Sequence, residues 1–385
     1  MKPLRSEDIT TMNVVEQGLI FDNSDAEASR KVTAFAALCV AGAGSIFSVS
    51  QIGPIKNAAT STLLLCRSHD RGRTWQTIDF KFETQVDGVP GSLSGGEMVE
   101  VAPGRLLLIA TWFDRSDPSR LLFDAESGGI LHSKQLLAES TDDGASWSSW
   151  REIDTAGLKG CALTGPILQW PDGAIGFAFE SFKEFDDPRP GHHAAWLMIS
   201  RDQGESFSDP MRVAEHPVHE IYYWDQRLCT AGGKEDYLAL FWSHDLAKQK
   251  DLNVHLGRGR LEGDALKCDP IVETSIPGQI AAPVWLDDGR LVAFVVERNQ
   301  TSTLTLWMSR DEGVSWPEKL VVYNHQEQAA ISQGSEEVDF NEYWEDMAKW
   351  SFGHPVARSL GNELLLSYYA GPPDQMSLHW ARVGL

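Results

Sequence analysis

The feature that most constrains the fold is an octet that occurs four times, Ser-x-Asp-x-Gly-x-(Ser/Thr)-(Trp/Phe). The copies occupy residues 68–75, 140–147, 200–207 and 309–316. Each position suits a tight hairpin. The Asp side chain can accept hydrogen bonds from nearby backbone amides, the Gly supplies a positive φ, and the aromatic ring anchors the turn on a sheet. Four copies in one chain indicate a repeated supersecondary unit.

A second series of turns sets the period of this unit. Turns at 41–44, 103–105, 171–173, 232–234, 287–289 and 360–362 each separate two short apolar runs. Each octet follows the second run of its unit, so one repeat is four strands with the octet in the second hairpin. A degenerate octet at 258–263 fills the long interval between the third and fourth copies.

Six such units predict an all-β fold, a six-bladed β-propeller, because a closed ring leaves no long exposed sheet edge. A β-sandwich array is the alternative. No Pro/Ser-rich linker or composition break divides the 385 residues, so residues 1–385 are expected to form a single domain. The expected blades are 28–83, 92–154, 160–214, 220–273, 278–323 and 350–385, the last closed by 14–22.

Net charge, Cys and His spacing, and the lengths of apolar runs argue against several classes of partner and cofactor. The net charge of −22 argues against nucleic acid and anionic membrane surfaces. The five Cys form no CxxC pair and are expected to be free thiols, and the His residues lack zinc-ligand spacing, so neither metal nor cofactor is expected. Residues 1–23 contain no apolar core of signal-peptide length, and no run approaches a membrane span, which predicts a cytoplasmic protein.

The octets are similar to Asp-box (BNR) repeats, and residues 28–385 resemble the sialidase (neuraminidase) superfamily of six-bladed propellers. The resemblance implies that the octets are structural and lie on the face opposite the active site. It also implies three Arg that clamp a substrate carboxylate, a Tyr/Glu nucleophile pair and an Asp acid/base. Here residues 30–32 read Arg-Lys-Val where the family has Arg-Ile-Pro, the loop 51–57 offers no carboxylate, and Arg298 is placed as a further Arg of the clamp.

Ligands are expected where the innermost strands begin and the second strands end. The densest group there is the stretch 219–227, at the start of the fourth innermost strand. Because alternate residues of a strand point the same way, Tyr223, Asp225 and Arg227 are expected to share one face. That row would supply a nucleophile or base, its charged partner and an anion or hydroxyl donor. A structural Asp225–Arg227 ion pair beneath aromatic residues is the competing interpretation.

Two further residues complete the predicted catalytic set. His244 is expected to act as acid or base, oriented by Asp245, unless it only caps its loop. Glu97 and Asp225 would provide the two carboxyl groups that glycosidases need. The predicted catalytic residues are Asp225, Tyr223, His244 and Glu97, and the predicted substrate-binding residues are Arg30, Arg227, Trp242, Gln279, Arg298, His354 and Glu180.

An acidic insertion at 325–349 has the spacing of an amphipathic helix, with Phe340, Tyr343, Trp344 and Met347 on one side. It is expected to cover the channel, to form a homo-oligomer contact, or to be only a solvated acidic face.

The resemblance and these residues together predict a carbohydrate-active enzyme, an exo-acting glycoside hydrolase for a small or terminal sugar, neutral or acidic. Two alternatives stay open. One is a uronate-type glycan lyase in which Tyr223 or His244 removes a proton beside a carboxylate held by Arg. The other is a non-catalytic sugar-binding or scaffold propeller, which a flat apolar rim would favour.

Overall fold

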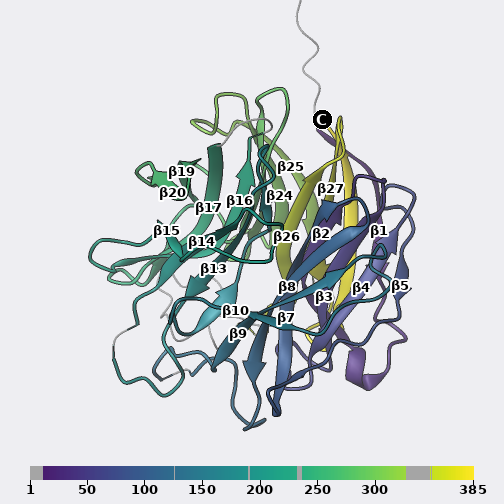
Figure 1. The fold of residues 1–385 in the computed structure, drawn as a ribbon. Coiled ribbons are helices and arrows are strands. Elements are labelled where there is room, and N and C mark those ends of the chain that lie inside the picture. The colour runs from purple at the N-terminus through teal and green to yellow at the C-terminus, as the bar shows by residue number, and fades with distance from the viewer. Residues whose placement is uncertain (1–11, 125, 190, 232–235, 327–346, 348) are drawn as a thin grey trace, which may run out of the picture.

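Six antiparallel sheets form a ring around one axis (Figure 1), so the predicted six-bladed β-propeller is confirmed. The computed structural model describes residues 12–124, 126–189, 191–231, 236–326, 347 and 349–385. Within those residues, none of the helices has both the length and the apolar character needed to cross a membrane.

The first three sheets run outward from the axis in chain order. The first contains β2 (Val32–Val40), β3 (Ile46–Gly53), β4 (Thr62–Ser68) and β5 (Gln76–Ile78), after the 3-10 helix η1 (Ala28–Arg30). The second contains β7 (Val89–Ala102), β8 (Arg105–Asp114), β9 (Ser133–Ser140) and β10 (Arg151–Ile153), with β6 (Gln85–Val86) beside β7. In the third, β11 (Cys161–Leu163) and β12 (Leu168–Gln169) both pair with β13 (Ile175–Ser181), followed by β14 (Ala194–Ser200) and β15 (Met211–Ala214).

The other three sheets repeat the plan. The fourth contains β16 (Ile221–Thr230), β17 (Asp236–Asp245), β19 (His255–Glu262) and β20 (Ala265–Cys268), with β18 (Lys250–Asp251) on β17 and β21 (Val272–Glu273) on β19. The fifth contains β22 (Ala281–Trp285), β23 (Leu291–Glu297), β24 (Thr303–Ser309) and β25 (Glu318–Asn324). The sixth contains β26 (Phe352–Ser359), β27 (Glu363–Ala370) and β28 (Ser377–Gly384), and β1 (Asn13–Phe21) is its outermost strand.

The core lies between neighbouring blades. Every residue of the second strands β3, β13 and β23 is buried, because each of these strands is covered on both faces by adjacent sheets. Phe294 of β23, for example, packs against Tyr368 of β27 with ring centroids 6.2 Å apart. The five Cys are free thiols, three of them buried.

All four octets adopt one hydrogen-bonded turn between the third and fourth strands of their blades. In the second copy, Gly144 N donates to Ser140 Oγ at 2.9 Å, and Ser146 N donates to the Asp142 carboxylate at 2.8 Å. The other copies repeat both bonds. These turns follow the ends of the third strands, so they lie at the face opposite the starts of the innermost strands.

Candidate functional site

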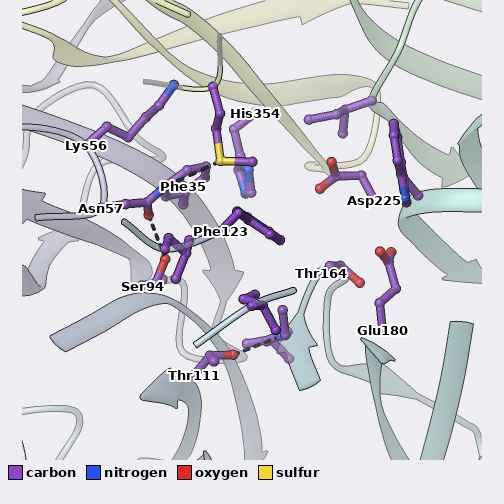
Figure 2. Close-up of a pocket in the computed structure, with 18 of the residues that line it drawn as sticks. Phe35, Lys56, Asn57, Ser94, Thr111, Phe123, Thr164, Glu180, Asp225 and His354 are labelled. Carbon is purple, nitrogen blue, oxygen red and sulfur yellow. Dashed lines mark hydrogen bonds between the residues drawn. The ribbon is translucent and has the colours of Figure 1, made fainter. Parts of the chain in front are cut away.

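One pocket at the central channel is lined by all six blades. The polar residues in its lining are Lys56, Asn57, Ser94, Glu97, Thr111, Thr164, Glu180, Asp225, Arg227, Arg298, His354 and Tyr369. The rest of the lining is aliphatic and aromatic, and its aromatic residues include Phe35, Trp224, Trp242 and Trp350. In Figure 2, Asp225 and Glu180 lie on the side of the pocket opposite Lys56 and Asn57, so an acidic side faces a basic one.

β-Bulges lie on four of the innermost strands where these strands line the pocket. The innermost strands β2, β7, β16 and β26 each have a register shift near the pocket. At these shifts Phe35, Gly95, Asp225 and His354 have positive φ angles of 51°, 97°, 45° and 52°. A bulge adds a residue to one strand and redirects its side chains. Through the repeated bulge, four innermost strands each contribute a residue to the pocket lining.

Glu97 is a buried carboxyl group whose negative charge has few hydrogen-bond donors and cations nearby. Within the described part of the chain its Oε2 has no hydrogen-bond partner, and the cation that contacts it is Arg358, with Nη2 at 3.8 Å. Burial raises the pKa of Glu97 to about 7, although Arg358 and Arg227 act to lower it. A carboxyl with this pKa exchanges a proton near neutral pH.

Asp225 belongs to an acidic group with Glu180. Burial raises the pKa of Asp225 to about 6, opposed by Arg227 and assisted by the charge of Glu180. Glu180 accepts a hydrogen bond from Gln226 N at 2.9 Å, and its other oxygen lies 3.0 Å from His193 Nε2. The two carboxyl groups therefore have different surroundings, although they share one side of the pocket.

Arg227 connects the acidic side to His354. Its Nη1 donates to the carbonyl oxygen of Thr164, its Nη2 donates to His354 Nδ1 at 3.1 Å, and Nη2 lies 3.6 Å from Asp225 Oδ1. Burial, followed by the charge of Arg227, holds the pKa of His354 well below its usual range. His354 is therefore neutral at physiological pH and accepts a hydrogen bond from Arg227.

The basic side contains Arg298 and Lys56. Arg298 is 3% exposed, its Nε and Nη1 have no hydrogen-bond partner among the described residues, and its guanidinium carbon lies 4.4 Å from the centroid of the Trp350 ring. Lys56 Nζ donates to the carbonyl oxygen of Trp350 at 2.7 Å and lies 3.2 Å from Tyr369 Oη. Buried donors without acceptors are costly unless a ligand supplies them.

Asp251 of β18 is the centre of a hydrogen-bond network next to the pocket. Its carboxylate accepts hydrogen bonds from Trp242 Nε1 at 2.9 Å and Gln279 Nε2 at 3.3 Å, and its Oδ1 lies 3.1 Å from His244 Nδ1. Gln279 Oε1 in turn accepts from Arg298 N at 2.9 Å. The network fixes the backbone at Arg298 and the plane of Trp242.

Four predicted site residues lie elsewhere. Tyr223 packs in the core against Phe241, with ring centroids 5.6 Å apart, because the bulge after Trp224 breaks the alternation that was expected to align it with Asp225. Arg30 lies on η1 with its guanidinium 6.0 Å from the Phe21 ring.

The other two displaced residues belong to the Asp251 network. His244 is fully buried, stacks on Trp224 and pairs with Asp251 rather than with Asp245, which binds Lys248. Gln279 accepts a hydrogen bond from the backbone N of Arg298 and does not line the pocket. The predicted residues that do line it are Glu97, Glu180, Asp225, Arg227, Trp242, Arg298 and His354.

Lys56 and Tyr369 were not predicted as site residues. Lys56 lies in the loop after β3, which the sequence marks only by its lack of a carboxylate, and Tyr369 lies at the end of the second strand of its blade. A topological rule that includes every polar residue at such strand ends would have found Tyr369, and it would have found Lys56 only if extended into the loop that follows.

The insertion lies mostly outside the described residues, which exclude 327–346 and 348 and hence Phe340, Tyr343 and Trp344. Its described residue Met347 lines the pocket, where Sδ accepts a hydrogen bond from Asn57 Nδ2 at 3.5 Å. In the described part of the chain, no three His, Cys, Asp or Glu side chains converge to hold a metal ion.

The sequence matches no protein-family model, and no curated protein is similar enough to be matched. Solved structures with the same fold are found at low identity. A protein of unknown function from Dyadobacter fermentans is 16% identical, with a TM-score of 0.72 and coverage of 98% of this chain and 100% of that one. A Hadza microbial sialidase is 14% identical, with a TM-score of 0.67 and coverage of 96% and 68%.

An intramolecular trans-sialidase from Ruminococcus gnavus, in complex with oseltamivir carboxylate, is 10% identical, with a TM-score of 0.62 and coverage of 95% and 97%. The chain therefore has the six-bladed fold of sialidases. At this identity the likeness extends to the fold alone.

Proposed function

We propose that this protein is an exo-acting glycoside hydrolase for a small or terminal acidic sugar. The observation that carries the proposal is one pocket that combines a buried carboxyl group, Glu97, and a half-buried one, Asp225, with a buried Arg298 whose Nε and Nη1 have no hydrogen-bond partner among the described residues. Glycosidases use a pair of carboxyl groups, one as acid and one as base or nucleophile.

The surroundings of the two carboxyl groups assign their roles. Glu97, with a pKa of about 7, is about half protonated at neutral pH and is the general acid that protonates the leaving oxygen. Asp225, with a pKa of about 6 and Arg227 beside it, is mostly ionised and is the base or nucleophile. Arg227 lowers the pKa of both groups and therefore lies close enough to influence each.

The rest of the pocket suits one sugar. Trp224, Trp242 and Trp350 offer flat apolar surfaces, and Arg298 offers N–H groups to which a carboxylate oxygen can bind. The described lining encloses about 130 Å³. A bound water needs about 10–15 Å³ on the same measure, so the pocket suits one small molecule rather than a chain segment.

The test is a panel of fluorogenic aryl glycosides that carry neutral and acidic sugars. Glu97→Gln and Asp225→Asn should each lower kcat/KM at least about a hundredfold on the best substrate. Arg298→Gln should mainly raise KM, and only for acidic sugars. Glu262→Gln, an exposed carboxylate on an outer hairpin that binds Lys267, is the matched control. Full turnover by Glu97→Gln would refute the assignment.

A glycan lyase is the second candidate, and it rests on His354. Its imidazole is neutral, and it would remove a proton next to a uronate carboxylate only when the substrate carboxylate draws Arg227 away from the acceptor nitrogen. Absorbance of an unsaturated product from uronate oligosaccharides, lost in His354→Gln but kept in Glu97→Gln, would favour the lyase. Sugar binding without any turnover would favour a non-catalytic propeller.

A further inference from the structure

Lys56 is a buried amine that the proposed hydrolysis does not use. It is 5% exposed, lines the pocket, and its Nζ lies 5.1 Å from the centroid of the Tyr369 ring and 5.9 Å from those of Phe35 and Trp350. Among the described residues no carboxylate forms an ion pair with it, and its hydrogen-bond partners are the carbonyl of Trp350 and the hydroxyl of Tyr369.

This setting disfavours the ammonium form. Burial, followed by the positive charge of Arg298, holds the pKa of Lys56 well below its ordinary value. The other titratable groups nearby are Tyr369 and His354, and neither brings a negative charge at neutral pH, since burial keeps the hydroxyl protonated and the imidazole neutral. A desolvated lysine next to another cation is one of the ways in which proteins produce a nucleophilic amine.

Arg298 determines which class of ligand would bind next to the Lys56 amine. Both side chains approach the Trp350 ring, whose centroid lies 4.4 Å from the guanidinium carbon and 5.9 Å from Lys56 Nζ. The unpartnered Nε and Nη1 of Arg298 suit a carboxylate. A carboxylate bound there would bring an attached carbonyl carbon towards Lys56.

We propose that Lys56 captures the carbonyl group of a small oxo acid as a Schiff base. The amine lone pair forms a bond to the carbonyl carbon, one amine proton passes to the carbonyl oxygen, and the resulting carbinolamine loses water to leave an imine. Tyr369 Oη, 3.2 Å from Nζ, is positioned to donate the proton that the departing oxygen takes and to recover one from the nitrogen. The step needs neither Glu97 nor Asp225, so it stands or fails independently of glycoside hydrolysis.

The test uses pyruvate as the oxo acid and acetaldehyde as the neutral carbonyl, each with borohydride to reduce any imine to a stable amine. The intact protein is labelled at pH 7 and each lysine is quantified by peptide mass spectrometry. Exposed lysines are neutral to only about one part in two thousand at this pH. Lys56 should therefore be labelled at least about tenfold faster than the exposed Lys159 and Lys267, which serve as internal controls. Labelling of Lys56 at or below their rate would overturn the proposal.

Two variants test the ligand class. Lys56→Arg keeps a long side chain with hydrogen-bond donors but cannot form an imine, and it should lose only the pocket adduct. Arg298→Gln should slow labelling of Lys56 by pyruvate at least about fivefold relative to labelling by acetaldehyde, since only pyruvate has a carboxylate to bind. Equal slowing of both reagents would overturn the assignment to oxo acids. Because the wild-type comparison needs no variant, a folding defect in either one leaves the proposal testable.

Discussion

At the scale of single residues, the chemistry of the pocket comes from burial with incomplete pairing. Desolvation disfavours whichever form of a group is charged, so it raises the pKa of an acid and lowers that of a base. Glu97 and Lys56 follow this rule in opposite directions within one pocket. Both groups are thereby held near the neutral form, in which an acid can donate a proton and an amine can attack.

The raised pKa of Glu97 predicts how stability depends on pH. Between about pH 4.5 and 7 the unfolded chain releases this proton while the folded protein keeps it, so the free energy of unfolding falls as pH rises through this window. Glu97→Gln removes the penalty. The variant should be more stable than wild type at pH 8, by on the order of 3 kcal/mol, and close to wild type at pH 4.5. Urea unfolding at the two pH values measures this, and a pH-independent difference would contradict it.

At the scale of strands, the sequence predicts positions well and side-chain directions less well. Glu97, Asp225 and Arg298 are found at the channel because inner-strand starts and second-strand ends converge there in any propeller. Tyr223 was wrongly aligned with Asp225 because strict alternation holds only without a bulge. A bulge depends on a residue tolerating positive φ in its tertiary setting, and nothing in an Asp, Phe or His residue marks that in the sequence.

The octet turn allows a stability prediction at this scale. Ser140 Oγ is buried and accepts hydrogen bonds from Gly144 N at 2.9 Å and Asp142 N at 3.4 Å. Ser140→Ala leaves the Gly144 N–H buried without an acceptor, which should lower the free energy of unfolding by about 1–2 kcal/mol. Ser149→Ala, at an exposed position of the same hairpin, should change it by less than about 0.5 kcal/mol. Chemical denaturation of both variants is the measurement, and equal effects would mean that the octet serine is not structural.

At the scale of the whole molecule, the ring is closed by the two ends of the described chain. β1 pairs antiparallel with β28, and Glu16 of β1 contacts Arg382 of β28 at 3.5 Å. The spacing of octets and turns predicts six units because each unit repeats the same local signals. The contacts that close the ring join residues more than 350 positions apart, and no local signal specifies how they pack.

Gly18 is a tightly packed position of this closure. It lies opposite Trp380 in the β1–β28 ladder, and a Cβ at this position would lie 2.9 Å from the indole Nε1. Trp380 is 3% exposed and packs among Ile20 and Leu378, so it has little room to move aside. Gly18→Val should therefore lower the free energy of unfolding by about 1–3 kcal/mol, the usual cost of overpacking.

The matched control is Leu19→Val, at the next position of β1, where the side chain is 39% exposed and the expected change is within about 0.5 kcal/mol. A double-mutant cycle with Trp380→Leu identifies the cause, because the smaller side chain makes room for the valine. If overpacking at the closure is responsible, Gly18→Val should cost clearly less in the Trp380→Leu background than in wild type. The same cost in both backgrounds would mean that the valine acts elsewhere in β1, and that Trp380 does not set the fit of the closing strand.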